Sequence, residues 1–141
     1  MDEDALGPVE GPLMRARLHI RGGKRRLREG KVSAGIVTLY DSLVCGMESY
    51  AAREENRKKL LLREGENLKD EKTLFAVLRR SGVLDDSLDF IEFEKLVTRA
   101  LDEEVNVDWK ELLARLERAF TQLGVMPFDE EKLPPEKPGT F

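Results

Sequence analysis

The sequence has few of the residues that build disulfides and metal centres. Its 141 residues include one cysteine, one histidine and one tryptophan. Cys45 therefore cannot form an internal disulfide, and together with His19 it supplies too few ligands for a zinc-type site. The chain also has no P-loop, no dinucleotide-binding fingerprint and no nucleophile elbow. These absences predict a chain without a cofactor, a metal or catalytic residues, and hence a protein that is not an enzyme.

Targeting and membrane-spanning segments are missing as well. The first residues, MDEDALGPVEGP, are acidic and rich in proline and glycine, whereas a secretory signal begins with basic and apolar regions. No apolar run approaches the roughly 20 residues that a membrane-spanning helix needs. The single thiol is compatible with a reducing compartment. We therefore expect a cytoplasmic protein that does not enter a membrane.

The most apolar segment of the chain is Val32–Ala52. Its apolar side chains recur at steps of three and four residues, which places them on one face of a helix. These side chains are Ile36, Leu39, Tyr40, Leu43, Met47 and Tyr50. The charged residues of the segment are Asp41 and Glu48, so most of the helix circumference is apolar. The pattern predicts a helix that is buried at the centre of the fold.

Capping residues and glycines delimit the other expected helices. These helices span about residues 13–28, 71–80, 86–103 and 109–123. The N-cap candidates are Asp70, Asp85, Asp86, Ser87 and Asp108. Within the first helix, the adjacent Gly22 and Gly23 predict either a kink or a new helix start at Gly23.

No segment alternates between apolar and polar residues with a period of two, so no sheet is expected. The predicted fold class is all-α, an antiparallel bundle of about five helices joined by short turns. Residues 1–11 are expected to form a flexible N-terminus and residues 12–124 the bundle. Residues 125–141 hold four of the six prolines and are expected to form an extended tail.

Positive charge is concentrated between residues 15 and 31, which hold eight arginines and lysines and one acid. The candidate contact patch is Arg21, Lys24, Arg25, Arg26 and Arg28. Such a patch can bind nucleic-acid phosphates, or it can face an acidic surface of this chain or of a partner. The acidic candidates are Asp102, Glu103 and Glu104. The segment lacks interleaved aromatic residues for base stacking, and the chain is acidic overall, which favours a contact with protein.

Residues 81–97 partly resemble an EF-hand, with Asp85, Asp89 and Glu92 as the oxygen ligands that the resemblance implies. A calcium loop needs an oxygen ligand at its third position and a glycine at its sixth. Val83 and Asp86 stand there instead. The segment is therefore interpreted as the capped start of an amphipathic helix, without a metal.

Residues 25–52 resemble two known helical families. In RLREGKVSAGIVTLYDSL, Gly30 marks the turn, and the small residues Ala34 and Ser42 flank Tyr40. This hairpin resembles a tetratricopeptide-type hairpin and the first helix pair of HEPN-type bundles, which occur beside nucleotidyltransferases or act as ribonucleases. Catalytic HEPN proteins carry an arginine and then a histidine late in the domain, whereas His19 lies near the start of this chain. The resemblance implies a HEPN-like protein without the nuclease site.

Taken together, these patterns predict a small cytosolic helical module for protein interaction or scaffolding, with a protein partner or a second copy of itself. The alternative is a HEPN-like accessory protein that contacts RNA through its basic segment. A third interpretation is a small-molecule pocket around Tyr40, Tyr50 and Trp109.

Overall fold

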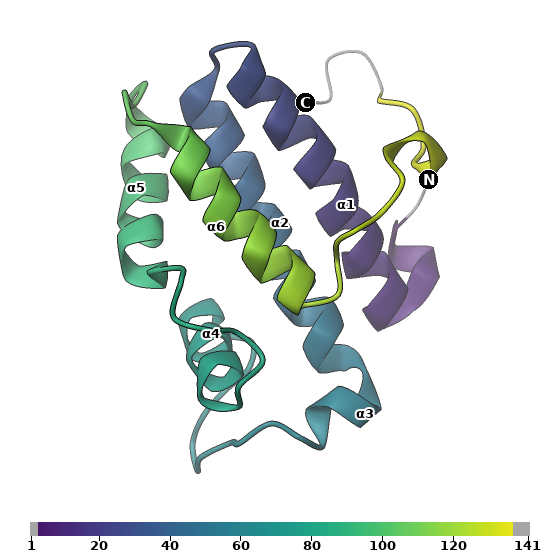
Figure 1. The fold of residues 1–141 in the computed structure, drawn as a ribbon. Coiled ribbons are helices and arrows are strands. Elements are labelled where there is room, and N and C mark those ends of the chain that lie inside the picture. The colour runs from purple at the N-terminus through teal and green to yellow at the C-terminus, as the bar shows by residue number, and fades with distance from the viewer. Residues whose placement is uncertain (1–2, 137–141) are drawn as a thin grey trace.

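The computed structural model describes residues 3–136, and this part of the chain consists of helices and connecting loops, without a strand (Figure 1). The elements are η1 (Glu3–Leu6), α1 (Gly7–Arg28), α2 (Val32–Ala52), α3 (Glu54–Arg57), α4 (Glu71–Arg80), α5 (Phe90–Asp102), α6 (Trp109–Gln122) and η2 (Glu130–Lys132). The predicted all-α class is confirmed. The last part of the expected tail, residues 137–141, lies outside the described residues.

Helices α1 and α2 form an antiparallel pair joined by a short turn (Figure 1). Gly30 occupies the turn with a φ of 81°, a conformation that glycine adopts without strain. The backbone N–H of Lys31 donates to Arg26 O at 2.9 Å and closes the end of α1. The turn therefore lies where the sequence predicts it.

Glycines bring the backbones of α1 and α2 close together. A Cβ atom on Gly23 would lie 2.8 Å from Leu39 Cγ, and a Cβ on Gly35 would lie 2.8 Å from Leu27 Cγ. Both distances are far shorter than a normal van der Waals contact. Gly23 therefore serves packing, and α1 continues through Gly22 and Gly23, although the sequence predicted either a kink or a new helix start there.

Helix α1 begins well before residue 13, where the sequence placed its start, and most of the expected flexible N-terminus, residues 1–11, is helical. Pro8 lies in the first turn, where a missing N–H leaves no helix hydrogen bond unmade. The hydroxyl of Ser49 donates to Val9 O at 2.7 Å. This bond ties the first turn of α1 to α2, a contact that local sequence does not reveal.

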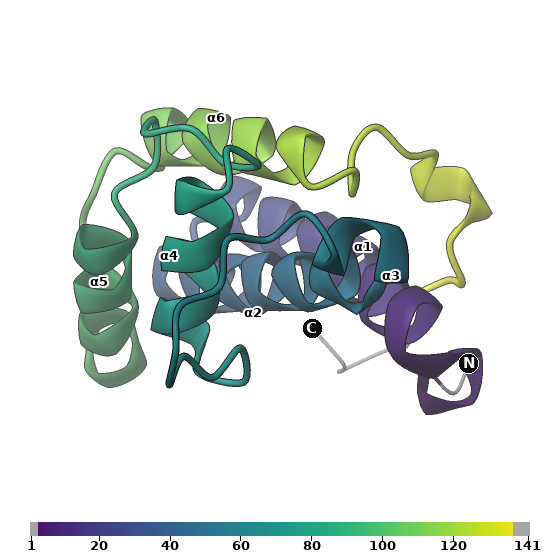
Figure 2. The same ribbon diagram turned by 90° about the horizontal axis from the view of Figure 1, so that it is seen from below.

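Helix α2 lies at the centre of the described fold and packs against α1, α4, α5 and α6 (Figure 2). Ile36, Leu43 and Met47 have no exposed surface. The bounds and the burial predicted for this helix are confirmed.

Three aspartates begin the outer helices: Asp70 caps α4, Asp89 caps α5 and Asp108 caps α6. Each side chain accepts a hydrogen bond from a backbone N–H in the first turn of its helix. Helix α5 thus begins later than predicted. Asp85, a predicted cap, instead accepts bonds from Ser87 and from α6.

The outer helices are arranged differently from the central pair. Helix α6 lies along α1 and α2, whereas α4 is viewed nearly along its axis in Figure 1 and so crosses them steeply. Residues 125–136 return along α1 as the described part of the tail. Val125 is fully buried, close to Gly46 of α2, and Phe128 packs against the core.

Candidate functional site

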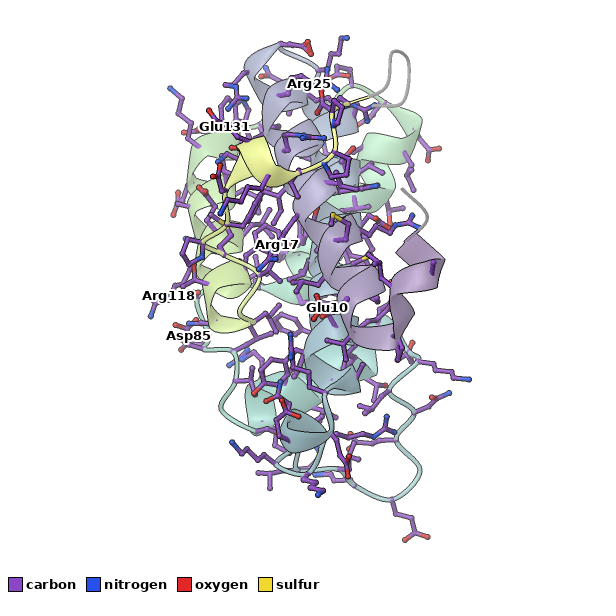
Figure 3. The ribbon with its side chains drawn as sticks, turned by 90° about the vertical axis from the view of Figure 1, so that its right-hand side faces the viewer. Glu10, Arg17, Arg25, Asp85, Arg118 and Glu131 are labelled. Atoms are coloured by element: carbon purple, nitrogen blue, oxygen red, sulfur yellow. The ribbon has the colours of Figure 1, made fainter. Side chains whose placement is uncertain are left out.

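Arg17, Arg21 and Arg25 form a row along the side of α1 that faces the C-terminal tail. Residues four apart lie nearly above one another on a helix, so the row extends over about 12 Å. Figure 3 shows Arg17 and Arg25 on this side of α1, with Glu131 on the neighbouring η2. We refer to these three side chains as the arginine row.

The arginine row binds the chain's own tail. Arg17 Nε donates to Val125 O at 3.0 Å, and Arg21 Nη2 donates to Pro134 O at 2.7 Å. The Glu136 carboxylate lies between two guanidinium groups, 3.5 Å from Arg21 Nε and 3.0 Å from Arg25 Nε. Arg17 also lies 5.6 Å from the centre of the Phe128 ring, a cation–π distance. The tail thus supplies most of the acceptors for the row, and Arg25 Nη1 also donates to Glu29 Oε1 of α1 at 2.9 Å.

The rest of the predicted basic patch points in other directions. Lys24 Nζ lies 3.5 Å from a carboxylate oxygen of Glu117 on α6, and Arg26 Nη1 donates to Thr38 Oγ1 of α2 at 2.9 Å. Arg28 is exposed to solvent. The structure therefore does not gather the five predicted residues on one open surface.

The acidic residues expected opposite the basic segment contact it differently. The carboxylate of Glu104 accepts a hydrogen bond from Ser33 N at 3.0 Å, so it neutralises the start of α2 rather than an arginine. Ser33 Oγ donates to Glu103 O at 2.7 Å and accepts from Val105 N at 2.8 Å. These bonds attach the loop after α5 to the hairpin.

A second polar cluster surrounds Asp41 of α2. Arg15 Nε and His19 Nδ1 of α1 lie 3.0 and 3.1 Å from Asp41 Oδ2. Cys45 Sγ lies 3.8 Å from the same oxygen. The His19 side chain is only 19% exposed. Sequence reasoning missed this cluster, although the four-residue spacings 15–19 and 41–45 place each pair on one helix face.

The chemistry of this cluster does not favour nucleophilic catalysis. Burial and the nearby Asp41 carboxylate raise the pKa of the Cys45 thiol to about 12. A reactive cysteine needs a lowered pKa, because the thiolate is the nucleophile. At neutral pH, Cys45 is therefore a protonated thiol that packs as a small buried side chain.

The loop between α4 and α5, which partly resembles an EF-hand, uses its aspartates internally. Asp85 accepts hydrogen bonds from Ser87, from Arg118 Nε at 2.6 Å and from Gln122 Nε2 at 2.8 Å. Asp89 caps α5. Within residues 3–136, no three side chains of histidine, cysteine, aspartate or glutamate are arranged to bind a metal ion.

An apolar groove of about 480 Å³ runs between α4 and the start of α5. Phe75, Leu88 and Phe90, all nearly buried, form its floor, and the ring centroids of Phe75 and Phe90 stack at 4.6 Å. Ala76 and Ile91 are exposed at its walls, and 44% of Ile91 is open to solvent. The groove is the most aromatic of the described cavities.

Charged residues line the rim of the groove. They are Lys72, Arg79, Asp86 and Asp89. The two basic residues lie on α4, and the two acidic residues lie in the loop and cap before α5. Arg79 and Asp86 are exposed, and within the described part of the chain neither forms an ion pair. The rim therefore has a basic side and an acidic side.

The aromatic residues that were expected to line a small-molecule pocket, Tyr40, Tyr50 and Trp109, lie apart from one another. Tyr40 packs against Phe90 and Phe93 and donates its hydroxyl to Glu71. Tyr50 lines a cavity beside the end of α6, whereas Trp109 begins α6. A single pocket bounded by Tyr40, Tyr50 and Trp109 does not form.

No protein-family model matches the chain, and comparisons with curated proteins and with solved structures gave no significant match. The resemblance of residues 25–52 to HEPN-type and tetratricopeptide-type hairpins therefore stays a prediction. Among the helices in the described residues, none is both long enough and apolar enough to cross a membrane.

Proposed function

We propose that the protein is a helical interaction module without catalytic activity of its own. More specifically, we propose that it self-associates through the groove between α4 and the start of α5. The observation that carries this proposal is the exposed Ile91 and Ala76 beside a floor of phenylalanine rings. Aromatic and aliphatic side chains of this kind form the cores of protein–protein interfaces. A cytoplasmic location belongs to the same proposal and is supported by the single thiol.

The charges at the rim favour a second copy of the chain as the partner. A two-fold interface brings residue i against residue j and residue j against residue i. Because Arg79 lies on one side of the groove and Asp86 on the other, a two-fold rotation can place each opposite its counterpart in the second copy. The groove is thus self-complementary in charge as well as apolar at its centre.

The proposal is tested by measuring molar mass as a function of concentration, by sedimentation equilibrium. We expect a reversible dimer for the wild type. Arg79→Glu and Asp86→Arg should each weaken the dimer, because each places like charges opposite one another. The double variant restores the pairing with its polarity reversed, and it should recover most of the affinity.

Ile91→Asp provides an independent disruption at the apolar centre, and Leu101→Asp is its matched control. Leu101 is 67% exposed on the same helix and does not line the groove. We expect Ile91→Asp to be monomeric and Leu101→Asp to behave as the wild type. A strictly monomeric wild type at millimolar concentration would contradict self-association. A dimer that persists in both the Ile91→Asp variant and the Arg79→Glu variant would contradict the proposed interface.

A further inference from the structure

We propose that the arginine row of α1 is a binding site for the phosphate backbone of RNA, and that residues 129–136 of the tail occupy this site as an internal acidic competitor. The site lies on a different face of the molecule from the groove between α4 and α5, so it stands independently of the proposed self-association. RNA would bind only after it displaces the tail.

The first argument is the geometry of the contact. The Glu136 carboxylate lies between the guanidinium groups of Arg21 and Arg25, and Arg21 also binds a backbone carbonyl oxygen of the tail. Guanidinium groups recognise phosphate oxygens with the same donor geometry that they use for carboxylates. Arg21 and Arg25 are therefore already arranged around one carboxylate of the tail, and Arg25 also pairs with Glu29.

The second argument is that the competitor is acidic and is held mainly by polar contacts, although the Arg21 and Glu136 side chains are only 15% and 27% exposed. Residues 129–136 contain four acids and one lysine, a net charge of −3. None of these eight residues is buried, and their contacts with α1 are ion pairs and hydrogen bonds from arginines. Segments with few buried apolar contacts open at a small free-energy cost. Displacement of this segment would leave the helices unchanged.

The third argument concerns the kind of polyanion. The row repeats a guanidinium about every 6 Å along one helix face. At its end Glu29 pairs with Arg25, and the exposed Arg28 and Lys31 on either side of Glu29 keep the local charge positive. None of the exposed large apolar side chains in residues 5–136 lies on α1 between residues 13 and 28. A protein ligand would need such apolar anchors, whereas a nucleic-acid backbone needs only regularly spaced cations. The composition of the whole chain favours a contact with protein, but the regular spacing of cations on this one surface favours RNA over an acidic protein.

The experiment uses the full chain and a short fluorescein-labelled single-stranded RNA, with Kd measured by fluorescence anisotropy. Glu136→Gln removes the carboxylate that occupies the row. Glu131→Gln is the matched control, because Glu131 loses the same charge from the same segment but is exposed and forms no ion pair with the row. We expect Glu136→Gln to tighten RNA binding about fivefold and Glu131→Gln to change it less than twofold.

Two further readouts test the site itself. Arg21→Gln combined with Arg25→Gln should weaken RNA binding about tenfold in the Glu136→Gln background, whereas Arg28→Gln should weaken it only slightly. Three phosphate contacts on a single strand predict that log K falls with log salt concentration with a slope of about −2. Thermal unfolding of each variant shows whether it is folded.

Hydrogen exchange links the binding to displacement of the tail. We expect saturating RNA to accelerate amide exchange in residues 129–136 and to leave α2 unchanged. Three results would each overturn the proposal: no RNA binding by Glu136→Gln at low salt, equal gains for Glu136→Gln and Glu131→Gln, or slower exchange of the tail in the complex. If the Glu136→Gln variant binds poly-glutamate but not RNA, the arginine row would instead be assigned as a binding site for an acidic protein.

Discussion

The α1–α2 hairpin and the outer part of the chain, residues 53–89, are held together by different forces. In the hairpin, glycines let two helices approach until Leu39 and Leu27 fill the space against the opposite backbone. In the outer part, Val77 and Leu78 of α4 join the same core, but the loops are attached by caps and ion pairs, such as Arg80 with Glu66. Asp70 with Thr73 is a further example. Leu61 and Leu62 of that part remain largely exposed.

This difference separates where the stability of the protein lies from where it meets its partners. A tightly packed pair of helices opens only when the whole domain unfolds, whereas regions held by exposed polar contacts open locally. Both proposed binding surfaces lie outside the contact between α1 and α2. One lies between α4 and α5, and the other lies beneath the tail on the outer side of α1.

The largest expected effect follows from filling the space between the two helices. In Gly35→Val, the new Cβ would meet Leu27 at 2.8 Å and the Gly23 carbonyl oxygen at 3.0 Å, and this backbone oxygen cannot move without separating the helices. We expect a loss of about 3 kcal/mol in the free energy of unfolding. Urea denaturation measures it, with the exposed Ala114→Val on α6 as control. Equal losses in both variants would contradict the close contact.

A smaller effect is expected where the hairpin meets the loop after α5. Ser33→Ala removes a hydroxyl that both donates to Glu103 O and accepts from the buried Val105 N. An unsatisfied buried donor is costly, so we expect a loss of about 2 kcal/mol. Ser33→Thr, which keeps the hydroxyl, should lose less in the same denaturation experiment. A loss in Ser33→Ala below that of the threonine variant would contradict the bridging role.

In the outer part, the expected loss is smaller again. Asp70→Ala removes the cap of α4, whose carboxylate accepts from Thr73 N at 3.0 Å. We expect the free energy of unfolding to fall by about 1 kcal/mol, the usual value of an N-cap. Glu64→Ala, an exposed acid in the preceding loop, is the control and should change stability little. If Asp70→Ala lowered the free energy of unfolding as much as Gly35→Val, the proposed difference between the two regions would be contradicted.

The two regions also predict opposite pH dependence. Hydrogen bonds from Arg80 lower the pKa of Glu66 from 4.5 to about 2, and hydrogen bonds from Thr73 lower the pKa of Asp70. A carboxylate with a lowered pKa stabilises the fold above its ordinary pKa. Its contribution is lost as the pH falls from about 4.5 toward 2. The outer part therefore predicts acid sensitivity, and Glu66→Gln should reduce it in denaturation curves measured across this range.

The hairpin predicts alkaline sensitivity instead. Burial raises the pKa of Cys45 from 9.0 to about 12 and also raises the pKa of Tyr40. Above pH 9 the unfolded chain releases the thiol proton while the folded chain retains it, so stability falls as the pH rises toward 12. Cys45→Ala should flatten this alkaline decline and leave the acid side unchanged. An alkaline decline that is unaffected by Cys45→Ala would contradict the assignment.

Much of the fold was predictable because its signals are local. The apolar spacing of Ile36, Leu43 and Met47 identified α2 with its bounds, and Asp70 and Asp108 identified the starts of α4 and α6. The start of α5 was not predictable in the same way. Asp85 and Asp89 are both good caps, and the choice between them depends on how Arg118 and Gln122 of α6 engage Asp85.

The candidate site was less accessible to sequence reasoning. A run of arginines indicates that an anion is bound but does not identify that anion. Arg17 and Arg21 find their acceptors 108 and 113 residues away, in a tail without a periodic pattern. The Asp41 cluster likewise depends on the register of α1 against α2. Gly23 and Gly35 permit the close approach of the two helices at that register, and neither glycine reveals its partner in the sequence.

The central claim is that α2 is the buried core on which the other helices pack, and native-state hydrogen exchange tests it most directly. We predict that amides in the middle of α2, such as those of Leu43 and Met47, exchange only through global unfolding, with the free energy that denaturation reports. Amides of α4 and of residues 129–136 should exchange through smaller openings. Exchange of the α2 amides as fast as those of α4 would contradict the account.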